Sequence, residues 1–378
     1  MNNKWSNIFL GSILLFNSTG SVASLLLSSD LIGYSALSGA ALNIAADSVI
    51  SDHLGGVGAI GIGARTDTSN IYSDAAVATG DSSNVGSVYS GAAAGIAASG
   101  SAENVYAKQA SVIGAIANVG NVYSGAAITL GAGSSSQEVY AAAAITGAGA
   151  SSFNAFTDTS AEVNLYQQTL DMADALDQIS NAQEALSALD SDFELDAIVG
   201  GPLPTLFTAG IYEGAAVSVV ADSIIQLDGE GAENPFWIFN LSAALTVGAR
   251  STFEIINAGA GASVIWNLGG ALGLGEGSSF IGTSFIKGAA TGATSNISCG
   301  NLYATAAIGI GSLISTNCIG SEENGWAGSV NGLVAGLDIT NGIASNRSLS
   351  ALSVPEPSTA FMLSAVLLLF LPLKFKRK

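Results

Sequence analysis

The segment Val88-Tyr89-Ser90-Gly91-Ala92-Ala93 recurs as Val122-Tyr123-Ser124-Gly125-Ala126-Ala127, and both copies belong to a longer periodic series. Its members are Tyr72, Tyr89, Tyr106, Tyr123 and Tyr140, each seventeen positions after the one before, each preceded by Ile or Val and each followed four positions later by alanine. A repeat this short holds only brief strands joined by turns, so it must stack on its neighbours to bury a face. The series therefore predicts a β-solenoid with one coil per repeat.

A second block of the sequence carries a similar signature after residue 260. Trp266, Phe285 and Tyr303 each precede a short segment rich in small residues, at spacings of nineteen and then eighteen positions. Since stacked strands lie about 4.8 Å apart, equivalent residues should form ladders along the solenoid. The ladder six residues after the aromatic one is Ala78, Gly95, Val112, Thr129, Thr146, Leu272 and Thr291. Its small side chains suit a surface as well as a thin core, so both interpretations stay open.

Two features of the sequence bear on whether the aromatic side chains point into the core or outward. Lys108 and Lys287 each lie two positions after an aromatic residue, which indicates that their ladder is exposed. Strict alternation along a strand would then expose the aromatic side chains too, unless a corner intervenes. We expect the aromatic ladder to be buried.

Residues 161–190 differ in character from the repeats. Leu165, Met172, Ile179 and Leu186 recur at intervals of seven among polar residues, without Gly or Pro. This spacing predicts one long amphipathic helix. At 1.5 Å per residue it would span roughly 45 Å, about the height of nine coils, so it could lie along the solenoid and seal an apolar face. A helix that dimerises as a coiled coil is the alternative.

The composition excludes several classes of function. Ten Lys and Arg residues against 29 Asp and Glu give a net charge of −19, which argues against a nucleic-acid partner. One histidine and two cysteines exclude a zinc cluster and argue against a catalytic triad, so we predict no enzyme, no metal and no cofactor. The histidine, His53, lies in an Asp- and Gly-rich segment that predicts a solvated surface turn.

The two cysteines, Cys299 and Cys318, are nineteen positions apart, which is one coil by the local period. Their side chains could therefore meet across adjacent coils. In a secreted chain this spacing predicts a disulfide that staples the end of the solenoid, nominally worth ~3 kcal/mol for a loop of this length.

The N-terminus has the pattern of a secretory signal peptide. Lys4 precedes an apolar run over residues 8–16, and Ser21-Val22-Ala23 supplies a small-x-small exit. We expect residues 1–23 to be removed and the mature protein to leave the cytoplasm.

The C-terminus combines Pro355-Glu356-Pro357, an apolar run over residues 361–373 and a basic tail over residues 374–378. The run is shorter than the ~20 residues of a stable transmembrane helix, which predicts a transient membrane anchor. In this order, residues 354–378 resemble the PEP-CTERM sorting signal. The resemblance implies a Gram-negative bacterium, processing by an exosortase and delivery to the cell surface or to extracellular polysaccharide. An ordinary single-span anchor is the alternative.

The region from Leu203 onward carries a series of distinct motifs. They are Leu203-Pro204-Thr205-Leu206-Phe207, Ile225-Gln226-Leu227-Asp228-Gly229, Pro235-Phe236-Trp237-Ile238-Phe239-Asn240, Phe253-Glu254-Ile255-Ile256-Asn257, Val264-Ile265-Trp266-Asn267 and Thr291-Gly292-Ala293-Thr294. This succession resembles the microbial ice-binding protein family. The resemblance implies a mostly β fold, a three-faced (triangular) discontinuous β-solenoid with one long helix packed alongside, and final coils that lie between N-terminal ones.

The resemblance covers residues 24–318 and completes the division of the chain. Residues 24–160 are expected to form the N-terminal coils, residues 161–190 the helix and residues 200–318 the C-terminal coils. Relative to family members with a shorter first block, the five Tyr coils look like an insertion of roughly four rungs. We expect residues 319–353 to form a cap and a linker.

A secreted, ice-binding protein is the function that this resemblance implies, with the ice surface as its partner. Such a surface needs a rigid wall of small apolar groups and hydroxyls with few charges. The candidate ice-binding residues are Thr129, Thr146 and Thr291, together with Thr305 on the ladder of the exposed lysines. A structural or adhesive protein of the extracellular matrix, with polysaccharide as a partner, is the alternative. A polysaccharide-cleaving β-helix enzyme is the third-ranked function. Such an enzyme would require clustered carboxylates or Lys and Arg residues on one ladder, and the periodic blocks lack them.

Overall fold

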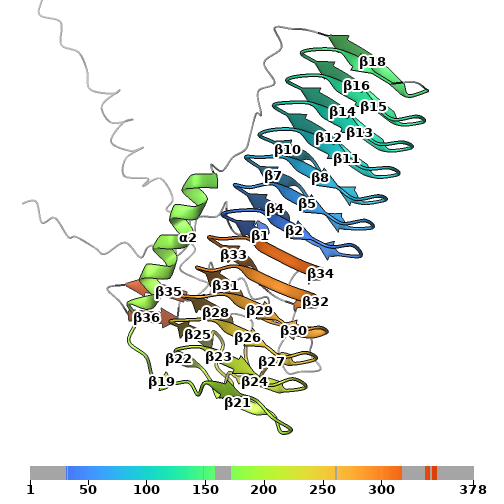
Figure 1. Ribbon diagram of the computed structural model, residues 1–378. Helices are drawn as coiled ribbons and strands as arrows, with labels where there is room; N and C mark the ends of the chain where they lie inside the picture. The colour runs from blue at the N-terminus through green and yellow to red at the C-terminus, as the bar shows by residue number, and fades with distance from the viewer. Residues whose placement is uncertain are drawn as a thin grey trace, which may run out of the picture.

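The chain forms a β-solenoid of about 14 turns with one α-helix beside it, as seen in a computed structural model (Figure 1). The structure describes residues 31, 33–147, 149–157, 172–259, 262–298, 300–316, 337–340 and 343–346. The predictions of a mostly β solenoid and of a helix alongside it are confirmed. The signal peptide, Cys299, Cys318, and the Pro355-Glu356-Pro357 tail lie outside the described residues.

Three stacks of parallel strands build the described part of the solenoid. Stack A contains, in spatial order, β19 (Phe193–Glu194), β22 (Gly210–Gly214), β25 (Phe236–Leu241), β28 (Ser263–Leu268), β31 (Thr283–Ile286), β33 (Leu302–Ala304), β1 (Tyr34–Ser38), β4 (His53–Gly56), β7 (Ile71–Ser73), β10 (Val88–Ser90), β12 (Ser101–Ala107), β14 (Asn118–Ser124), β16 (Ser135–Ala141) and β18 (Ser151–Thr157).

Stack B follows stack A in each coil. It contains β20 (Ile198–Val199), β23 (Val217–Val219), β26 (Leu245–Val247), β29 (Leu272–Leu274), β32 (Ala290–Ser298), β34 (Ile308–Thr316), β2 (Leu42–Ile44), β5 (Ile60–Ile62), β8 (Val77–Thr79), β11 (Ala94–Ile96), β13 (Ser111–Ile113), β15 (Ile128–Leu130) and β17 (Ile145–Thr146).

Stack C completes each coil. It contains β21 (Thr205–Thr208), β24 (Ile224–Asp228), β27 (Thr252–Ile256), β30 (Ser278–Phe280), the ends of β32 and β34, β3 (Val49–Ile50), β6 (Asp67–Thr68), β9 (Asn84–Val85) and the beginnings of β12, β14, β16 and β18. Apart from these stacks, β35 (Leu337–Thr340) and β36 (Ile343–Asn346) form an antiparallel hairpin.

The solenoid is discontinuous in sequence. The N-terminal block starts in the middle of the stack and rises to β18, and the C-terminal block starts at the far end and rises to meet it (Figure 1). At the junction β33 pairs with β1, and β34 pairs with β2 and β3. The final coils therefore abut the first N-terminal coil. The expectation that they lie between N-terminal coils is wrong, because β1 and β2 pair directly with β4 and β5.

Alternation along the short strands determines what is buried. In stack B the outer two residues of each three-residue strand point into the core, and the middle one points outward. Tight corners follow these strands. A Cβ at Gly80 would lie 2.3 Å from the backbone nitrogen of Ala64, so only glycine allows this approach between coils.

The aromatic ladder lies on the outside of stack A. Tyr72, Tyr89, Tyr106, Tyr123, Tyr140 and Phe156 form one column, with neighbouring ring centroids 4.8–5.1 Å apart. Tyr72 is buried, the other tyrosines are half-buried and Phe156 is 46% exposed. The expectation of a buried ladder is therefore wrong for most of its length. Strict alternation holds here, as the exposed Lys108 indicated.

The C-terminal aromatics do not all belong to this column. Phe285 pairs with Tyr303, which pairs with Leu37, and that line continues through Gly55 to Tyr72. Trp266 instead pairs with Ser284, points into the core and stacks on Phe239 with centroids 4.0 Å apart. The prediction that Trp266 is equivalent to Phe285 is thus one residue out of register.

Helix α2 (Met172–Ser187) covers the outside of stack A in the C-terminal block (Figure 1). Its buried residues are Met172, Ala175, Ile179, Ala182 and Leu186, which follow the predicted spacing. The first part of the predicted helix, residues 161–171, lies outside the described residues. They pack in one cluster with Ile238, Ile265, Phe285 and Tyr303. Among the described residues, no helix is long and apolar enough to cross a membrane.

Candidate functional site

The outward residues of stack B form one uninterrupted column, which we call the B ladder. In spatial order they are Ile198, Ser218, Thr246, Gly273, Thr291, Gly309, Asn43, Gly61, Ala78, Gly95, Val112, Thr129 and Thr146. The column crosses the junction between the two blocks without a break. It contains hydroxyls, small apolar groups and one amide, and it contains no charged residue.

An alanine lies beside the B ladder in almost every coil, two residues before the outward position. These residues form the alanine column, Ala216, Ala244, Ala271, Ala289, Ala307, Ala41, Ala59, Ala76, Ala93, Ala110, Ala127 and Ala144. All are exposed or half-buried. Their carbonyls accept hydrogen bonds from the neighbouring coil, such as Val77 N to Ala93 O at 3.0 Å. The sequence period revealed five of these alanines, but strand pairing was needed to assign them to the surface.

Three of the four predicted threonines share the B ladder. Thr129 pairs with Thr146, and their hydroxyls lie 3.4 Å apart. Thr291 lies farther along the same column, next to Gly309. All three are exposed. Leu272 does not belong to this ladder, because it pairs with Ala290 inside the core and is fully buried, whereas Gly273 takes the outward position.

Thr305 lies elsewhere. It follows β33 at the corner after stack A, is half-buried, and donates its hydroxyl to the carbonyl of Lys287 at 2.9 Å. It lines the groove beside α2 rather than the B ladder. The structure therefore separates Thr305 from the other three candidates.

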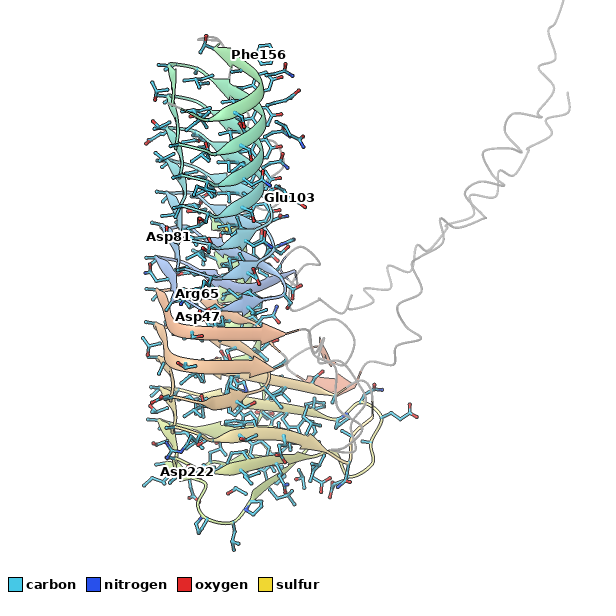
Figure 2. All side chains as sticks on the ribbon, turned by 90° about the vertical axis from the view of Figure 1, so that its right-hand side faces the viewer. Asp47, Arg65, Asp81, Glu103, Phe156 and Asp222 are labelled. Carbon is cyan, nitrogen blue, oxygen red and sulfur yellow. The ribbon has the colours of Figure 1, made fainter. Side chains whose placement is uncertain are left out.

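Charged residues border the B ladder at some of the corners that follow stack B strands. Figure 2 shows Asp47, Arg65, Asp81 and Asp222 along one edge of the solenoid. Asp47 pairs with Arg65 across one coil, and Asp222 pairs with Arg250 in the same way, each at 2.6 Å. The hydrogen bonds from each guanidinium lower the pKa of the paired carboxyl and raise that of the arginine. The corner charges are thus held beside the ladder and not on it.

The middle of the B ladder is recessed. A shallow depression of about 460 Å³ is lined by Asn43, Gly61, Ala78 and Gly309, among others. It exists because the two glycines beside Asn43 carry no side chain. A Cβ at Gly309 would meet no atom within 4 Å, so this gap is open to solvent.

The other surfaces have a different character. The outward column of stack C includes Asp67, Asn84, Ser101, Asn118 and Ser135, whose hydroxyls bond along the column, as from Ser135 to Asn118 at 2.9 Å. The outside of stack A is covered by α2 in the C-terminal block and bears the tyrosine column in the N-terminal block.

A groove of about 770 Å³ lies between α2 and stack A and holds carboxylates, amides and Lys287. The side-chain amides of Asn240 and Asn267 in this groove bind α2 to the solenoid. Asn240 donates to the carbonyl of Leu186 at 2.8 Å, and Asn267 donates to the hydroxyl of Ser187 at 2.9 Å. Within the described part of the chain, no group of three or more His, Cys, Asp or Glu is arranged to hold a metal ion.

His53 is not in a solvated turn. It begins β4, is half-buried, and its Nδ1 accepts a hydrogen bond from the backbone N–H of Asn70 at 3.3 Å. Its ring makes edge contacts with Tyr34 and Tyr72. Burial lowers the pKa of His53 and raises that of Asp52 beside it. The turn prediction fails because the Gly-rich segment after His53 is itself a strand.

Comparison with known proteins identifies a family whose model matches this sequence. A model of the family described as ice-binding-like matches residues 114–315, just over half of the chain. No curated protein matches the sequence.

Several solved structures are similar to this chain. One is an ice-binding protein from the Antarctic ascomycete Antarctomyces psychrotrophicus, with 18% identity, a TM-score of 0.41, and coverage of 77% of this chain and 96% of that one. Another is an ice-binding protein from an Arctic yeast, with 14% identity, a TM-score of 0.39, and coverage of 79% and 96%. A third, from an Antarctic bacterium of the Flavobacteriaceae, has 14% identity, a TM-score of 0.32, and coverage of 77% and 98%.

Proposed function

This chain belongs to the ice-binding-like family, and on that premise we propose that it adsorbs to ice through the B ladder and the alanine column, without catalytic turnover. Adsorbed molecules would then limit the growth or recrystallisation of ice around the cell.

The observation that carries this proposal is the absence of charge along the whole B ladder. A charged group holds its own hydration shell, and stripping that shell against a solid surface costs free energy without a matching partner. Small apolar groups and hydroxyls avoid this cost. Charged residues lie on stack C, as at Asp67, and at the corners, as at Asp47 and Arg65, so charge borders the B ladder without entering it.

Rigidity is the second requirement. Each stack B strand is hydrogen-bonded to the coils above and below, so the outward groups are held at a fixed spacing of about 4.8 Å. The side chains are short and lose little rotamer entropy on adsorption. The B ladder and alanine column therefore combine fixed spacing with a low ordering cost, which suits a crystalline partner.

The test compares charges placed on two faces. We expect Thr129→Lys with Thr146→Lys to abolish inhibition of ice recrystallisation by purified protein. The matched control, Ser101→Lys with Ser135→Lys, places the same charges at similar height on stack C and should retain activity. Equal activity of both double variants would move the site away from stack B. Crystals that coarsen at the buffer rate with the unaltered protein would contradict ice binding itself.

We also propose that the protein acts outside the cell. The N-terminal pattern of residues 1–23 and the resemblance of residues 354–378 to an exosortase sorting signal support export to the surface of a Gram-negative bacterium. Under the oxidising conditions found there, Cys299 and Cys318 would be free to pair. Mass spectrometry of protein recovered from the native cell would detect loss of both ends and the presence of the disulfide.

A matrix or adhesive role is the competing proposal, and the sorting-signal resemblance is the observation that favours it. It predicts retention of the exported protein by cell-surface polysaccharide, with no effect on ice. Double variants at Thr129 and Thr146 would then leave that retention unchanged.

A further inference from the structure

The first coil of the C-terminal block, residues 193–208, forms one end of the solenoid and is called the end coil (Figure 1). It contains β19, β20 and β21. Among the described residues each of these strands pairs on one side only, with β22, β23 and β24 respectively. The backbone groups on the other side form an open edge, and such an edge is a template for pairing with a further strand.

Large apolar side chains gather on the end coil. Phe193, Ile198, Leu203 and Leu206 are 44–77% exposed. Phe193 stacks on Tyr212 with ring centroids 4.8 Å apart, and Tyr212 belongs to the core. Terminal repeats of a solenoid normally have a polar outer face. The end coil instead exposes the end of the hydrophobic core, so it has the character of a docking surface.

Strand β21 is held firmly at this edge. The indole N–H of Trp237 donates to the carbonyl of Phe207 at 3.1 Å, and the hydroxyl of Tyr212 donates to the carbonyl of Thr208 at 2.7 Å. Both donors come from coils farther inside the stack. Because β21 is already ordered, it loses little conformational entropy when another strand pairs with it.

The seam between the two blocks shows what kind of surface fits such an edge. There β33 and β34 pair with β1, β2 and β3, although these strands lie far apart in the sequence. One end coil of this chain thus docks on another without direct chain continuity. A second copy of the chain can supply such a coil in the same way.

The two ends of the solenoid differ, which favours contact between like ends. At the far end β18 runs from stack C into stack A without a break, whereas β21 and β22 are separate strands. Two copies of the same end match by identity. The resulting dimer has closed two-fold symmetry, the commonest symmetry of homo-oligomers.

Charge decides which strand lies at the two-fold axis. Strand β19 contains Glu194 and is flanked by Asp192 and Asp196, so two copies of β19 side by side would repel each other. Strand β21 has no charged residue and is longer than β19 or β20. A two-fold axis perpendicular to the solenoid reverses strand direction. An axis at β21 therefore makes an antiparallel pair of β21 strands and keeps the two copies of β19 apart.

We propose that two copies of this chain dock through their end coils, with β21 of one copy paired antiparallel to β21 of the other. The pairing supplies partners for the open edge and buries apolar side chains of the end coil. The end coil has fewer residues than the roughly 20–30 a side of a standard interface, so we expect a dissociation constant on the order of 1 μM.

Sedimentation velocity of the purified protein over a range of concentrations tests this association. We expect one and two copies to interconvert, and Leu206→Asp to raise the dissociation constant at least tenfold, because it places like charges on both sides of the axis. Ile116→Asp is the matched control, since Ile116 is 71% exposed in the N-terminal block. Single copies at every concentration, or equal effects of the two aspartates, would overturn the proposal. Species that grow beyond two copies would overturn the two-fold contact and indicate head-to-tail stacking.

A single engineered cysteine tests which strand lies at the axis. With Cys299 and Cys318 replaced by serine, Leu206→Cys should form disulfide-linked pairs of chains under mild oxidation. Ile198→Cys, on β20 of the same coil, is the control, because its two copies lie on opposite sides of the axis. Linked pairs that are absent from Leu206→Cys, or that are as frequent with Ile198→Cys, would contradict the proposed pairing. Neither measurement involves ice, so the proposed function can fail while this inference stands.

Discussion

Gly309 in β34 lies directly beside Asn43 in β2, and this pair joins the C-terminal block to the N-terminal block on the B ladder. Gly61 lies on the other side of Asn43. The recess in the proposed ice-binding surface therefore coincides with the seam where the two blocks meet. A surface that must match a flat crystal has its weakest section at this seam.

Filling the recess should strengthen the surface. We expect Gly309→Thr to raise ice-growth inhibition, because a Cβ at this position meets no atom within 4 Å and threonine adds a hydroxyl and a methyl in line with Thr291. Threonine also suits a strand better than glycine, by up to ~1 kcal/mol. Thermal hysteresis and the melting temperature both report the change.

Gly58→Thr is the control for the recess. A Cβ there would lie 2.5 Å from the backbone of Ala40, so this variant should lose stability. If Gly309→Thr lowers activity while the fold is intact, the recess itself contributes to binding and the argument from flatness is wrong.

Thr291 and Thr305 should behave differently although both were candidates from the sequence. Thr291→Lys places a charge on the B ladder, and we expect adsorption to ice to weaken about tenfold, or about 1.4 kcal/mol. Thr305→Lys points toward the groove beside α2, where Glu213 and Glu184 can accommodate a cation, so activity should persist.

Ice-affinity partitioning of the two purified variants measures this difference. Comparable partitioning of the lysine variants at 291 and 305 would show that the B ladder has no special role. Loss of activity in Thr305→Lys alone would assign binding to the α2 side of the solenoid.

The sequence predicted much of this arrangement because a strict period of seventeen positions leaves few ways to stack a coil. It correctly grouped Thr129, Thr146 and Thr291 on one ladder. It misplaced Trp266 and Leu272, because the C-terminal coils vary in length and a slip of one residue exchanges the two faces of a strand. The seam at Gly309 and Asn43 could not be predicted from spacing, since it depends on where the returning chain docks.

The corner after β13 contains a strained residue whose removal should stabilise the protein. Ile116 has a φ of 58°, a left-handed conformation that costs a β-branched residue roughly 1–2 kcal/mol. The equivalent residue one coil later is Gly133, with a φ of 71°. Since Ile116 is 71% exposed, little burial is lost on replacement.

We expect Ile116→Gly to raise the free energy of unfolding by about 1 kcal/mol, with Ile116→Asn in between, because asparagine tolerates this conformation better than isoleucine. Thermal and denaturant unfolding would measure the series. Destabilisation by both replacements would mean that the exposed isoleucine makes contacts that outweigh its backbone strain.

His53 should make the stability of the solenoid depend on pH. Its burial lowers its pKa from the ordinary value of 6.5, and its Nδ1 already accepts the N–H of Asn70, so protonation favours the unfolded chain. The stabilising contribution is then complete above about pH 6.5 and is lost as the pH falls through the folded pKa. Asp52 acts in the opposite direction, because burial raises its pKa, and its contribution is lost as the pH rises through the folded value.

Substitutions at His53 and Asp52 separate these two contributions to the pH dependence. Unfolding temperatures between about pH 7.5 and pH 5 should fall in the unaltered protein and fall less in His53→Gln, with Asp52→Asn retaining the histidine effect. Identical slopes for the unaltered protein and His53→Gln would show that His53 titrates freely and that its contacts with Tyr34 and Tyr72 do not oppose protonation.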